Sequence, residues 1–397
     1  MSHIGIQSFD QTEDWDAFVA AHPKGSIFHT AAMCRTMQAT KGYEVLAIAA
    51  CVGDGDVQAI LVAIRISTIR SLGRLAARSI MFAEPICSDD EIGEKCLNRL
   101  LEHHDRCVAQ RTLFSEVRPV FHCGPNRYER DECVSETSAF RQGEREHAVM
   151  ISRGYERLGY NNYVVDLTRP ENELWNNINA KCRRDILRSE RRGVTLRDGN
   201  LIDDLGVLYG HLQQSHSRSH VPLVDRSLFV AAARELPTKQ VSLCIAEYQG
   251  APIASVCNLI FKGRVFCWYA GIIRTPGIAA NSMLNWDAIR RGAADGHSIL
   301  DFAGAGWKGE AYGPGKFKSR FGGRLVEYGR YRRIHSKPAM KAAETVYRYA
   351  RRLLDLHTGE KIRIPKHSIS GSSEHPPIVA KEDWKQSHKN TGGEYAI

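Results

Sequence analysis

Apolar positions in the first third of the chain change from helical spacing to short continuous runs. Trp15 and Val19 lie one helical turn apart in a segment whose pattern predicts a helix. Apolar runs with β-branched residues follow at 44–52 and 57–66, and turn-forming residues occupy 53–56 between them. This order predicts a helix followed by a β-hairpin.

Helical spacing returns after the hairpin. Apolar residues that include Cys96, Leu97 and Leu100 predict a long helix over 91–110, and the run at 112–117 predicts another strand. The next segment, 121–147, is polar and weakly patterned, so we expect a loop there.

The rest of the chain repeats this succession of elements. Its predicted helices share helical apolar spacing and cover 150–158, 171–192, 201–219, 225–236 and 281–295. Its predicted strands are bounded by turn signals and cover 162–167, 241–248, 253–261, 264–272, 299–303 and 324–328. Helices before an antiparallel run of strands, with a later helix between strands, indicate an α+β unit that occurs twice.

These patterns divide the chain into four parts. We expect a first domain at 1–160, a second domain with the active site at 161–333, a helical segment at 334–358 and a disordered polar tail at 359–397. The helical segment carries a basic, amphipathic pattern. Two contacts fit this pattern: docking on the first domain, or peripheral contact with an anionic membrane surface.

Length and composition describe an ordinary globular chain. Its 397 residues are 43% hydrophobic and 25% charged, which excludes a mostly disordered or fibrous protein. No run approaches the roughly 20 apolar residues that a membrane span needs, and no basic segment followed by an apolar run opens the sequence. We therefore expect a cytoplasmic protein that could act at the inner face of the membrane.

The net charge of +9 is concentrated in two blocks. Residues 181–197 and 316–333 each hold seven lysines and arginines, against two acidic residues in the first block and one in the second. Such blocks favour an anionic partner, which is a nucleic acid, a phosphorylated small molecule or a membrane surface.

Several catalytic and cofactor motifs are excluded. Residues 304–309 have the spacing Gly-x-Gly-x-x-Gly, but Gly-Pro-Gly follows at 313–315 where a dinucleotide-binding turn would open a helix, so we interpret them as a flexible loop that holds substrate. The histidines at 211, 216 and 220 lack the partners of a metal site, and no metal is expected. The cysteines form no Cys-x-x-Cys pair, which favours buried free thiols.

Residues 274–279 are a candidate site for donor phosphates. They lie between a predicted strand and a predicted helix, where backbone amides at a helix N-terminus can hold a pyrophosphate. Their pattern, with Arg274, Gly277 and Ala279 at its fixed positions, resembles the acyl-CoA signature of the GNAT acetyltransferases.

Four stretches carry a wider resemblance. They are GSIFHT at 25–30, LWNNINAKCRRDI at 174–186 with RGV at 192–194, LDFAGA at 300–305, and KFKSRFGG at 316–323. In order and spacing the chain resembles the FemABX family, the aminoacyl-tRNA-dependent transferases that build peptidoglycan side bridges. It is also similar to their FemAB-related, GNAT-type relatives in bacterial surface-polysaccharide clusters. The resemblance spans about residues 10–335.

This resemblance implies tandem GNAT-like domains, with the C-terminal segment returning to the first domain. It implies acyl transfer to an amine without a bound cofactor, through attack on an activated ester or thioester. The family's Phe-Lys motif falls on Phe317 and Lys318, which makes Lys318 the candidate that stabilises the oxyanion or the phosphates of the donor. No general base is assigned. The family's phosphate-binding positions in the first domain match no single residue, and Lys24, Arg35 and Lys41 all fit.

Further substrate-binding candidates come from the same stretches and from nearby aromatic residues. Arginines 183 and 184 suit the phosphate groups of a nucleotide-linked or lipid-linked acceptor, or a tRNA backbone, because guanidinium binds phosphate bidentately. The remaining candidates could line a groove for the substrate: His29, Trp268, Tyr269, Trp307, Tyr312, Phe317 and Arg320.

We therefore expect an acyl- or aminoacyltransferase that forms an amide on an amino group of a peptidoglycan precursor or an amino-sugar polysaccharide. The co-substrate is aminoacyl-tRNA or acyl-CoA, and the acceptor carries phosphate. Two alternatives stay open: an acyl-CoA-dependent GNAT N-acetyltransferase, and a non-catalytic basic GNAT-fold module that binds RNA or an anionic membrane.

Overall fold

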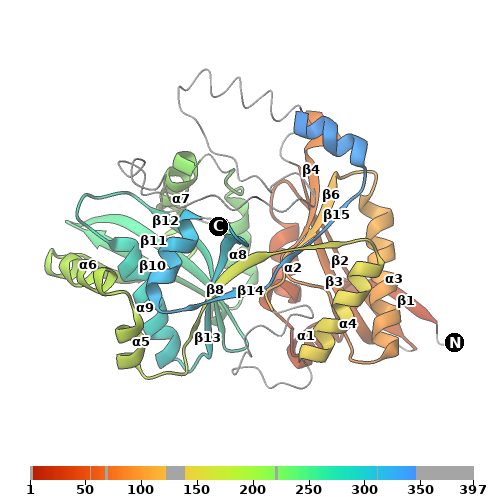
Figure 1. Ribbon diagram of the computed structural model, residues 1–397, viewed down its shortest axis with the longest axis horizontal. Helices are drawn as coiled ribbons and strands as arrows, with labels where there is room; N and C mark the ends of the chain where they lie inside the picture. Colours follow the sequence, from red (N-terminus) through yellow and green to blue (C-terminus); the bar gives the residue numbers. More distant parts are fainter. Residues whose placement is uncertain are drawn as a thin grey trace, which may run out of the picture.

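The computed structural model describes residues 3–53, 55–67, 70–121, 139–219, 222–310 and 312–345. Two mixed β-sheets stand side by side, and helices cover them (Figure 1). The α+β class and the tandem arrangement expected from the sequence are confirmed. None of the described helices combines the length and the apolar character that are needed to cross a membrane.

The first sheet has the strand order β1-β2-β3-β4-β6-β15-β7, with β5 paired to β3. Its strands are β1 (Ile4–Ser8), β2 (Tyr43–Val52), β3 (Asp56–Ser67), β4 (Ala77–Met81), β5 (Ile86–Cys87), β6 (Phe114–Val117), β7 (Glu156–Leu158) and β15 (Arg330–Ile334). All pairs are antiparallel except β4 with β6, which helix α3 (Glu91–Val108) connects. A parallel pair needs such a crossover, because its second strand must start again at the same edge.

The second sheet has the order β14-β8-β13-β12-β11-β10-β9. Its strands are β8 (Tyr160–Asp166), β9 (Thr195–Gly199), β10 (Val241–Tyr248), β11 (Ala251–Phe261), β12 (Arg264–Ile272), β13 (Ile299–Trp307) and β14 (Arg324–Glu327). Again one pair is parallel: β12 and β13 are paired over three residues each, and helix α9 (Ala280–Ala294) connects them. The second unit therefore repeats the plan of the first.

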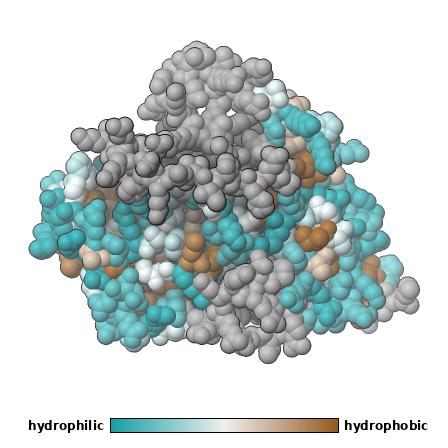
Figure 2. Space-filling model, in the orientation of Figure 1, coloured by the Kyte–Doolittle hydropathy of each residue, from teal (hydrophilic) through white to brown (hydrophobic). Residues whose placement is uncertain are grey.

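The remaining helices lie around and between the sheets (Figure 1). They are α1 (Trp15–Ala21), α2 (Ala31–Gln38), α4 (Ala139–Ser152), α5 (Glu171–Asn177), α6 (Ala180–Arg191), α7 (Leu205–Ser219), α8 (Ser227–Glu235) and α10 (Gly313–Lys318). Residues 337–345 are also helical. On the face drawn in Figure 2, the described surface is mostly hydrophilic, and its hydrophobic areas are small and separate.

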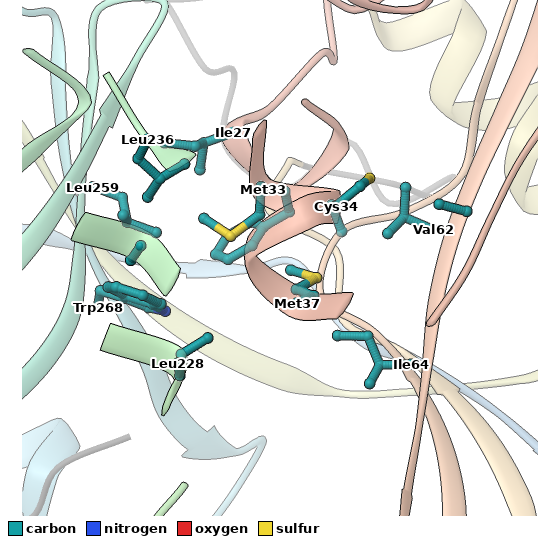
Figure 3. Packing of buried hydrophobic residues seen from close by; sticks show 14 of the residues in the cluster. Ile27, Met33, Cys34, Met37, Val62, Ile64, Leu228, Leu236, Leu259 and Trp268 are labelled. Carbon is teal, nitrogen blue, oxygen red and sulfur yellow. The ribbon is translucent and has the colours of Figure 1, made fainter. Parts of the chain in front are cut away.

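A hydrophobic cluster that we call the shared core joins the two units. It contains buried side chains of α1, α2 and β3 from the first unit and of α7, α8, β11 and β12 from the second. Figure 3 shows Met33 and Met37 of α2 between β3 on one side and Leu228 and Trp268 on the other. Each large side chain that is fully buried contributes about 1.5–3 kcal/mol, so the two sheets are held in one relative position.

Several sequence expectations need correction. Residues 330–334 form β15 in the first sheet, so the second unit ends before residue 333. The helix expected at 150–158 is correct only as far as Ser152, because Gly154 takes a left-handed φ of 81° after α4, and 156–158 are strand β7. Residues 139–147, expected as a loop, begin α4. The expected helix at 171–192 is two helices, since the Asn179 side chain caps the second one.

Some expectations fall outside the described residues. Residues 122–138 of the expected loop at 121–147 are outside the described residues. The same holds for the part of the expected helical segment at 334–358 that follows residue 345. The expected disordered tail at 359–397 is entirely outside the described residues.

A buried charged cluster lies beside the first sheet. Lys24 bonds to Glu146 of α4 and lies 3.2 Å from Glu84, and all three side chains are at most 1% exposed. Glu84 also accepts the amide of Val120 at 2.9 Å. Burial raises the pKa of Glu146 to about 7 despite the attraction of Lys24, whereas Lys24 and backbone donors hold the pKa of Glu84 below its usual range. One lysine balances one carboxylate, so Glu146 favours its protonated form.

We predict that Glu146 makes folding less favourable as the pH rises from about 4.5 to 7. The native state holds a proton on Glu146 in this range and the unfolded state does not, so up to about 3 kcal/mol of stability is lost. Buried His22 and His29, whose pKa values are lowered by burial to about 3 and 4, act in the opposite direction below pH 6.5.

The difference between wild type and Glu146→Gln isolates the contribution of Glu146. Urea unfolding at pH 5, 6, 7 and 8 should show the variant gaining stability relative to wild type up to pH 7. A difference that does not vary with pH would contradict the prediction.

Candidate active site

The candidate site is built around an irregular part of β13. Pairing of β13 with β8 shifts register on both sides of Gly304, and Ala303 has a φ of 58°, which is costly for a residue with a side chain. Small residues permit close packing here: a Cβ on Gly304 would lie 2.4 Å from the Tyr160 hydroxyl oxygen, and one on Gly315 would lie 2.4 Å from the Ala305 carbonyl oxygen. The glycine-rich segment expected as a flexible loop is therefore a packed strand as far as Trp307.

Lys318 ends helix α10 and points at this strand. Its Nζ donates to the Gly304 carbonyl oxygen at 2.7 Å, and the residue is only 8% exposed. Among the described residues no carboxylate lies within ion-pair distance of it. Burial lowers the pKa of Lys318 to about 8, against the raising effects of Cys267 and Asp301. At pH 7 the protonated form therefore prevails by about tenfold.

Asp301 stabilises the irregular part of β13 through its side-chain contacts. It is fully buried, pairs with Arg264 at 3.0 Å, and accepts the Ala303 amide at 2.7 Å and the Asn162 side chain at 3.3 Å. Burial raises the pKa of Asp301. Because its oxygens serve Ala303 and Arg264, Asp301 holds the strand in shape rather than offering a free base.

Other expected site residues lie near Lys318. Phe317 is half-buried against Phe321, with ring centres 5.3 Å apart, and the Arg320 guanidinium lies 5.8 Å from the Phe317 ring centre. Tyr312 is 37% exposed, and its Cβ lies 2.6 Å from where a Cβ on Gly306 would be. Phe317 therefore packs against the core of the second unit, whereas Tyr312 is exposed.

Trp307 lies at the junction of the two units, at the end of β13. Its ring meets the Tyr160 ring edge-on at 5.0 Å, and the guanidinium of Arg330 lies 3.6 Å from the Tyr160 ring centre. Neither Tyr160 nor Arg330 belongs to a motif that marks it as a candidate in the sequence. The only signal for Arg330 was its place in the basic block at 316–333.

Three residues that were expected to bind substrate instead make contacts with other side chains and backbone groups of the protein. His29 is 1% exposed: its Nδ1 accepts the Ser26 amide, so its Nε2 donates to the Glu84 carbonyl oxygen at 2.8 Å. Trp268 belongs to the shared core, and the Tyr269 ring packs on Phe229 at 5.0 Å. These contacts correct the expectation that the three side chains line a groove.

The two arginines expected to bind phosphate differ in their surroundings. Arg183 donates to carbonyl oxygens at the end of α5, at 2.8 Å from Ile178 and 3.3 Å from Trp175. Its Nη1 therefore caps α5. Arg184 is exposed on α6.

The expected donor-phosphate loop is tied to α6. The Ala279 amide donates to the Ser189 hydroxyl at 2.8 Å, and Arg192 donates to the Gly277 carbonyl oxygen at 3.0 Å. Gly277 has a φ of 74°, and a Cβ there would meet the Arg192 guanidinium. One amide of the expected phosphate-binding loop is thus hydrogen-bonded within the protein. Arg274, at the start of the loop, is exposed.

Comparisons with known proteins agree with this geometry. Residues 180–318 match the family described as acetyltransferase (GNAT) domain. This match supports the relationship to GNAT acyltransferases that the motifs predict.

Its fold is similar to that of FemX, with a TM-score of 0.60 and 14% identity over 85% of this chain and 99% of FemX. A tandem GNAT protein of the clavulanic acid biosynthesis pathway is similar at a TM-score of 0.52 and 10% identity, over 85% of this chain and 99% of its own. L-PGS from Bacillus licheniformis is similar at a TM-score of 0.51 and 12% identity, over 84% of this chain and 95% of its own. No curated protein sequence matches.

We predict that the Lys318 amine titrates near pH 8, well below the ~10.4 of an ordinary lysine, because burial disfavours its charged form. NMR of the protein with labelled lysine side chains would show this resonance, and its absence from Lys318→Met would assign it. Titration of the assigned resonance at an ordinary pH would contradict the described burial.

We predict that Arg183→Ala lowers the free energy of unfolding by about 1 kcal/mol, because carbonyl groups at the end of α5 lose their donor. Arg184→Ala is the matched control and should change stability by less than about 0.5 kcal/mol. Urea unfolding of both variants tests this. Equal effects of the two substitutions would show that the cap contributes nothing.

Proposed function

We propose that this protein transfers an acyl or aminoacyl group to an amino group of a phosphate-bearing cell-envelope precursor. The observation that carries the proposal is Lys318, a buried cation with one hydrogen bond to a carbonyl oxygen and no ion-pair partner among the described residues. Burying a cation without a partner is costly, and such groups occur where negative charge develops during a reaction.

The proposed reaction is attack by the acceptor amine on the carbonyl carbon of an activated ester or thioester. A C–N bond forms, and the carbonyl oxygen becomes an oxyanion that the Lys318 ammonium stabilises by a hydrogen bond. The C–O or C–S bond to the carrier then breaks as the carbonyl re-forms. The amine proton leaves to the departing group or to water. Lys318 needs its proton for this role.

For the donor, we propose an aminoacyl-tRNA or another large acyl carrier. Acyl-CoA is the second candidate, favoured by the match of residues 180–318 to an acetyltransferase domain. The loop at 274–279 supports it less than the sequence indicates, because the Ala279 amide is bonded to Ser189. A non-catalytic module that binds RNA or membrane gains no support from the buried lysine.

We also propose that the protein acts in the cytoplasm, at the inner face of the membrane, where lipid-linked precursors would be reached. This rests on the basic blocks and on the chemistry of the acceptor.

We predict that Lys318→Ala lowers kcat by roughly 10²–10³-fold with little change in KM, because it removes a donor to the oxyanion. Purified protein would be incubated with charged tRNA or acetyl-CoA and with amino-sugar or peptide precursors, and the products weighed by mass spectrometry. Lys316→Ala, an exposed lysine on the same helix, is the control and should retain activity within about twofold.

Undiminished turnover in Lys318→Ala would overturn the role of this lysine. Salt-sensitive binding of tRNA or vesicles without transfer from any donor would instead favour the non-catalytic module. Which donor yields product decides between the two carriers.

A further inference from the structure

Asp301 stabilises a bulge in β13. Asp301 is paired with Val164 of β8, and the next pair is Gly304 with Asn162. Strand β13 therefore advances three residues where β8 advances two, which inserts one residue into the strand. The inserted segment contains Ala303, whose φ of 58° is unfavourable for a residue with a side chain. Asp301 Oδ1 accepts the Ala303 amide at 2.7 Å and so holds this conformation.

Arg264 of the neighbouring strand β12 holds the Asp301 carboxylate. Its Nη1 lies 3.0 Å from Asp301 Oδ2, and only 14% of the Arg264 side chain is exposed. Strand register explains this pair: Phe266 is the direct partner of Asp301, and Arg264 lies two residues earlier on the same face. The Asn162 side chain donates to Asp301 Oδ1 at 3.3 Å. Each oxygen of the buried carboxylate thus has a donor, and Arg264 balances its charge.

The guanidinium of Arg264 also contacts the first unit. It lies 4.6 Å from the ring centre of Phe121, which follows β6. The amide of the preceding residue, Val120, donates at 2.9 Å to Glu84, a member of the buried charged cluster, so Phe121 is anchored in the first unit. Arg264 Nη1 also donates to the Tyr328 hydroxyl at 3.4 Å, where the chain passes from β14 to β15. Arg264 therefore joins the second sheet to the first unit.

This series of contacts ends at the ammonium of Lys318. The Gly304 carbonyl oxygen, on the residue after Ala303, accepts Lys318 Nζ at 2.7 Å. A Cβ on Gly304 would lie 2.4 Å from the Tyr160 hydroxyl oxygen, so the backbone is tightly packed at this point. The Gly304 carbonyl group therefore sets the place of the ammonium, and Asp301 sets the shape of the backbone that carries this carbonyl group.

Asp301 also acts on Lys318 through its charge. Burial lowers the pKa of Lys318 to about 8, and the nearby Cys267 and Asp301 act in the opposite direction. Removal of the Asp301 charge would therefore let the pKa of Lys318 fall further. An ammonium that stabilises an oxyanion needs its proton at pH 7, so the carboxylate favours the form of Lys318 that the proposed reaction uses.

We propose that Arg264 and Asp301 are positioning residues, through which the first unit fixes the place and the charge of the Lys318 ammonium. Neither side chain needs to touch the substrate. This inference rests on the proposed function, because it assigns how the two units act together on the lysine of the transfer reaction. A displacement of about 1 Å in a reacting group can lower a rate by about 100-fold, so a rigid path between the units matters for the reaction.

The NMR signal of the Lys318 amine tests this arrangement in the full chain without any need for turnover. In Asp301→Asn the side chain keeps its size and an oxygen for the backbone amide, but it loses its negative charge. The Lys318 amine should therefore lose its proton at a lower pH than in the wild type. Arg197→Ala is the matched control. It breaks ion pairs with Asp204 and Glu247 at the far edge of the same sheet and should leave the titration unchanged.

Transfer kinetics test the positioning itself. Arg264→Ala should lower kcat by roughly 10–100-fold with KM within about twofold of wild type, and Arg264→Lys, which keeps the charge, should recover part of the loss. In Asp301→Asn the decline of kcat above about pH 8 should begin at a lower pH. Phe121→Leu removes the ring next to Arg264 and should lower kcat about threefold. Thermal unfolding identifies a variant that fails to fold, and Phe121→Leu and Asp301→Asn keep the test open if Arg264→Ala does so.

A Lys318 titration that is the same in Asp301→Asn and in the wild type overturns the proposal. Phe121→Leu with the kcat of the wild type and an unshifted Lys318 signal also overturns it, because the first unit would then take no part. A shifted titration without transfer from any donor leaves this inference standing and the proposed function failing. Transfer that depends on Lys318 but not on Arg264 does the opposite.

Discussion

Burial of apolar side chains between the two sheets is the constraint on which the candidate site depends. The shared core joins α2 and β3 to α8 and β12, and Phe28 meets Phe266 edge-on across the junction at 5.2 Å. Polar contacts between the units, such as Lys262 to the His22 carbonyl oxygen at 2.7 Å, lie around it. Because dense apolar packing tolerates little displacement, residues from both units can meet with fixed geometry. The contact of Arg330 from the first sheet with the ring of Tyr160 from the second sheet is one example.

The costly features of the structure gather at this junction. A buried lysine without a carboxylate partner among the described residues and a left-handed Ala303 both reduce stability. The large apolar cores on both sides make such costs tolerable. The buried cluster of Lys24, by contrast, is closed by its own partners, and it serves the packing of α4.

Elements with strong local signals could be predicted from the sequence. Strands β10 and β12 coincide with their predicted ranges because each is a mostly apolar run between turns. Strand β15 could not be predicted, since Arg-Tyr-Arg-Arg carries little apolar signal and its partners lie far away in the chain. Within the site, the motif containing Lys318 was visible in the sequence, but the contact of Arg330 with Tyr160 was not. Only the return of β15 to the first sheet brings Arg330 to the Tyr160 ring.

The return of β15 to the first sheet has a consequence for how the protein is made. This strand is inserted between β6 and β7, so both of its neighbours leave the ribosome before it does. The entire second sheet must be synthesised in between, which takes on the order of 10–35 s at usual elongation rates. During that interval the facing edges of β6 and β7 are unpaired. The nascent first unit is thus the stage at which aggregation, or protection by a chaperone, is most expected.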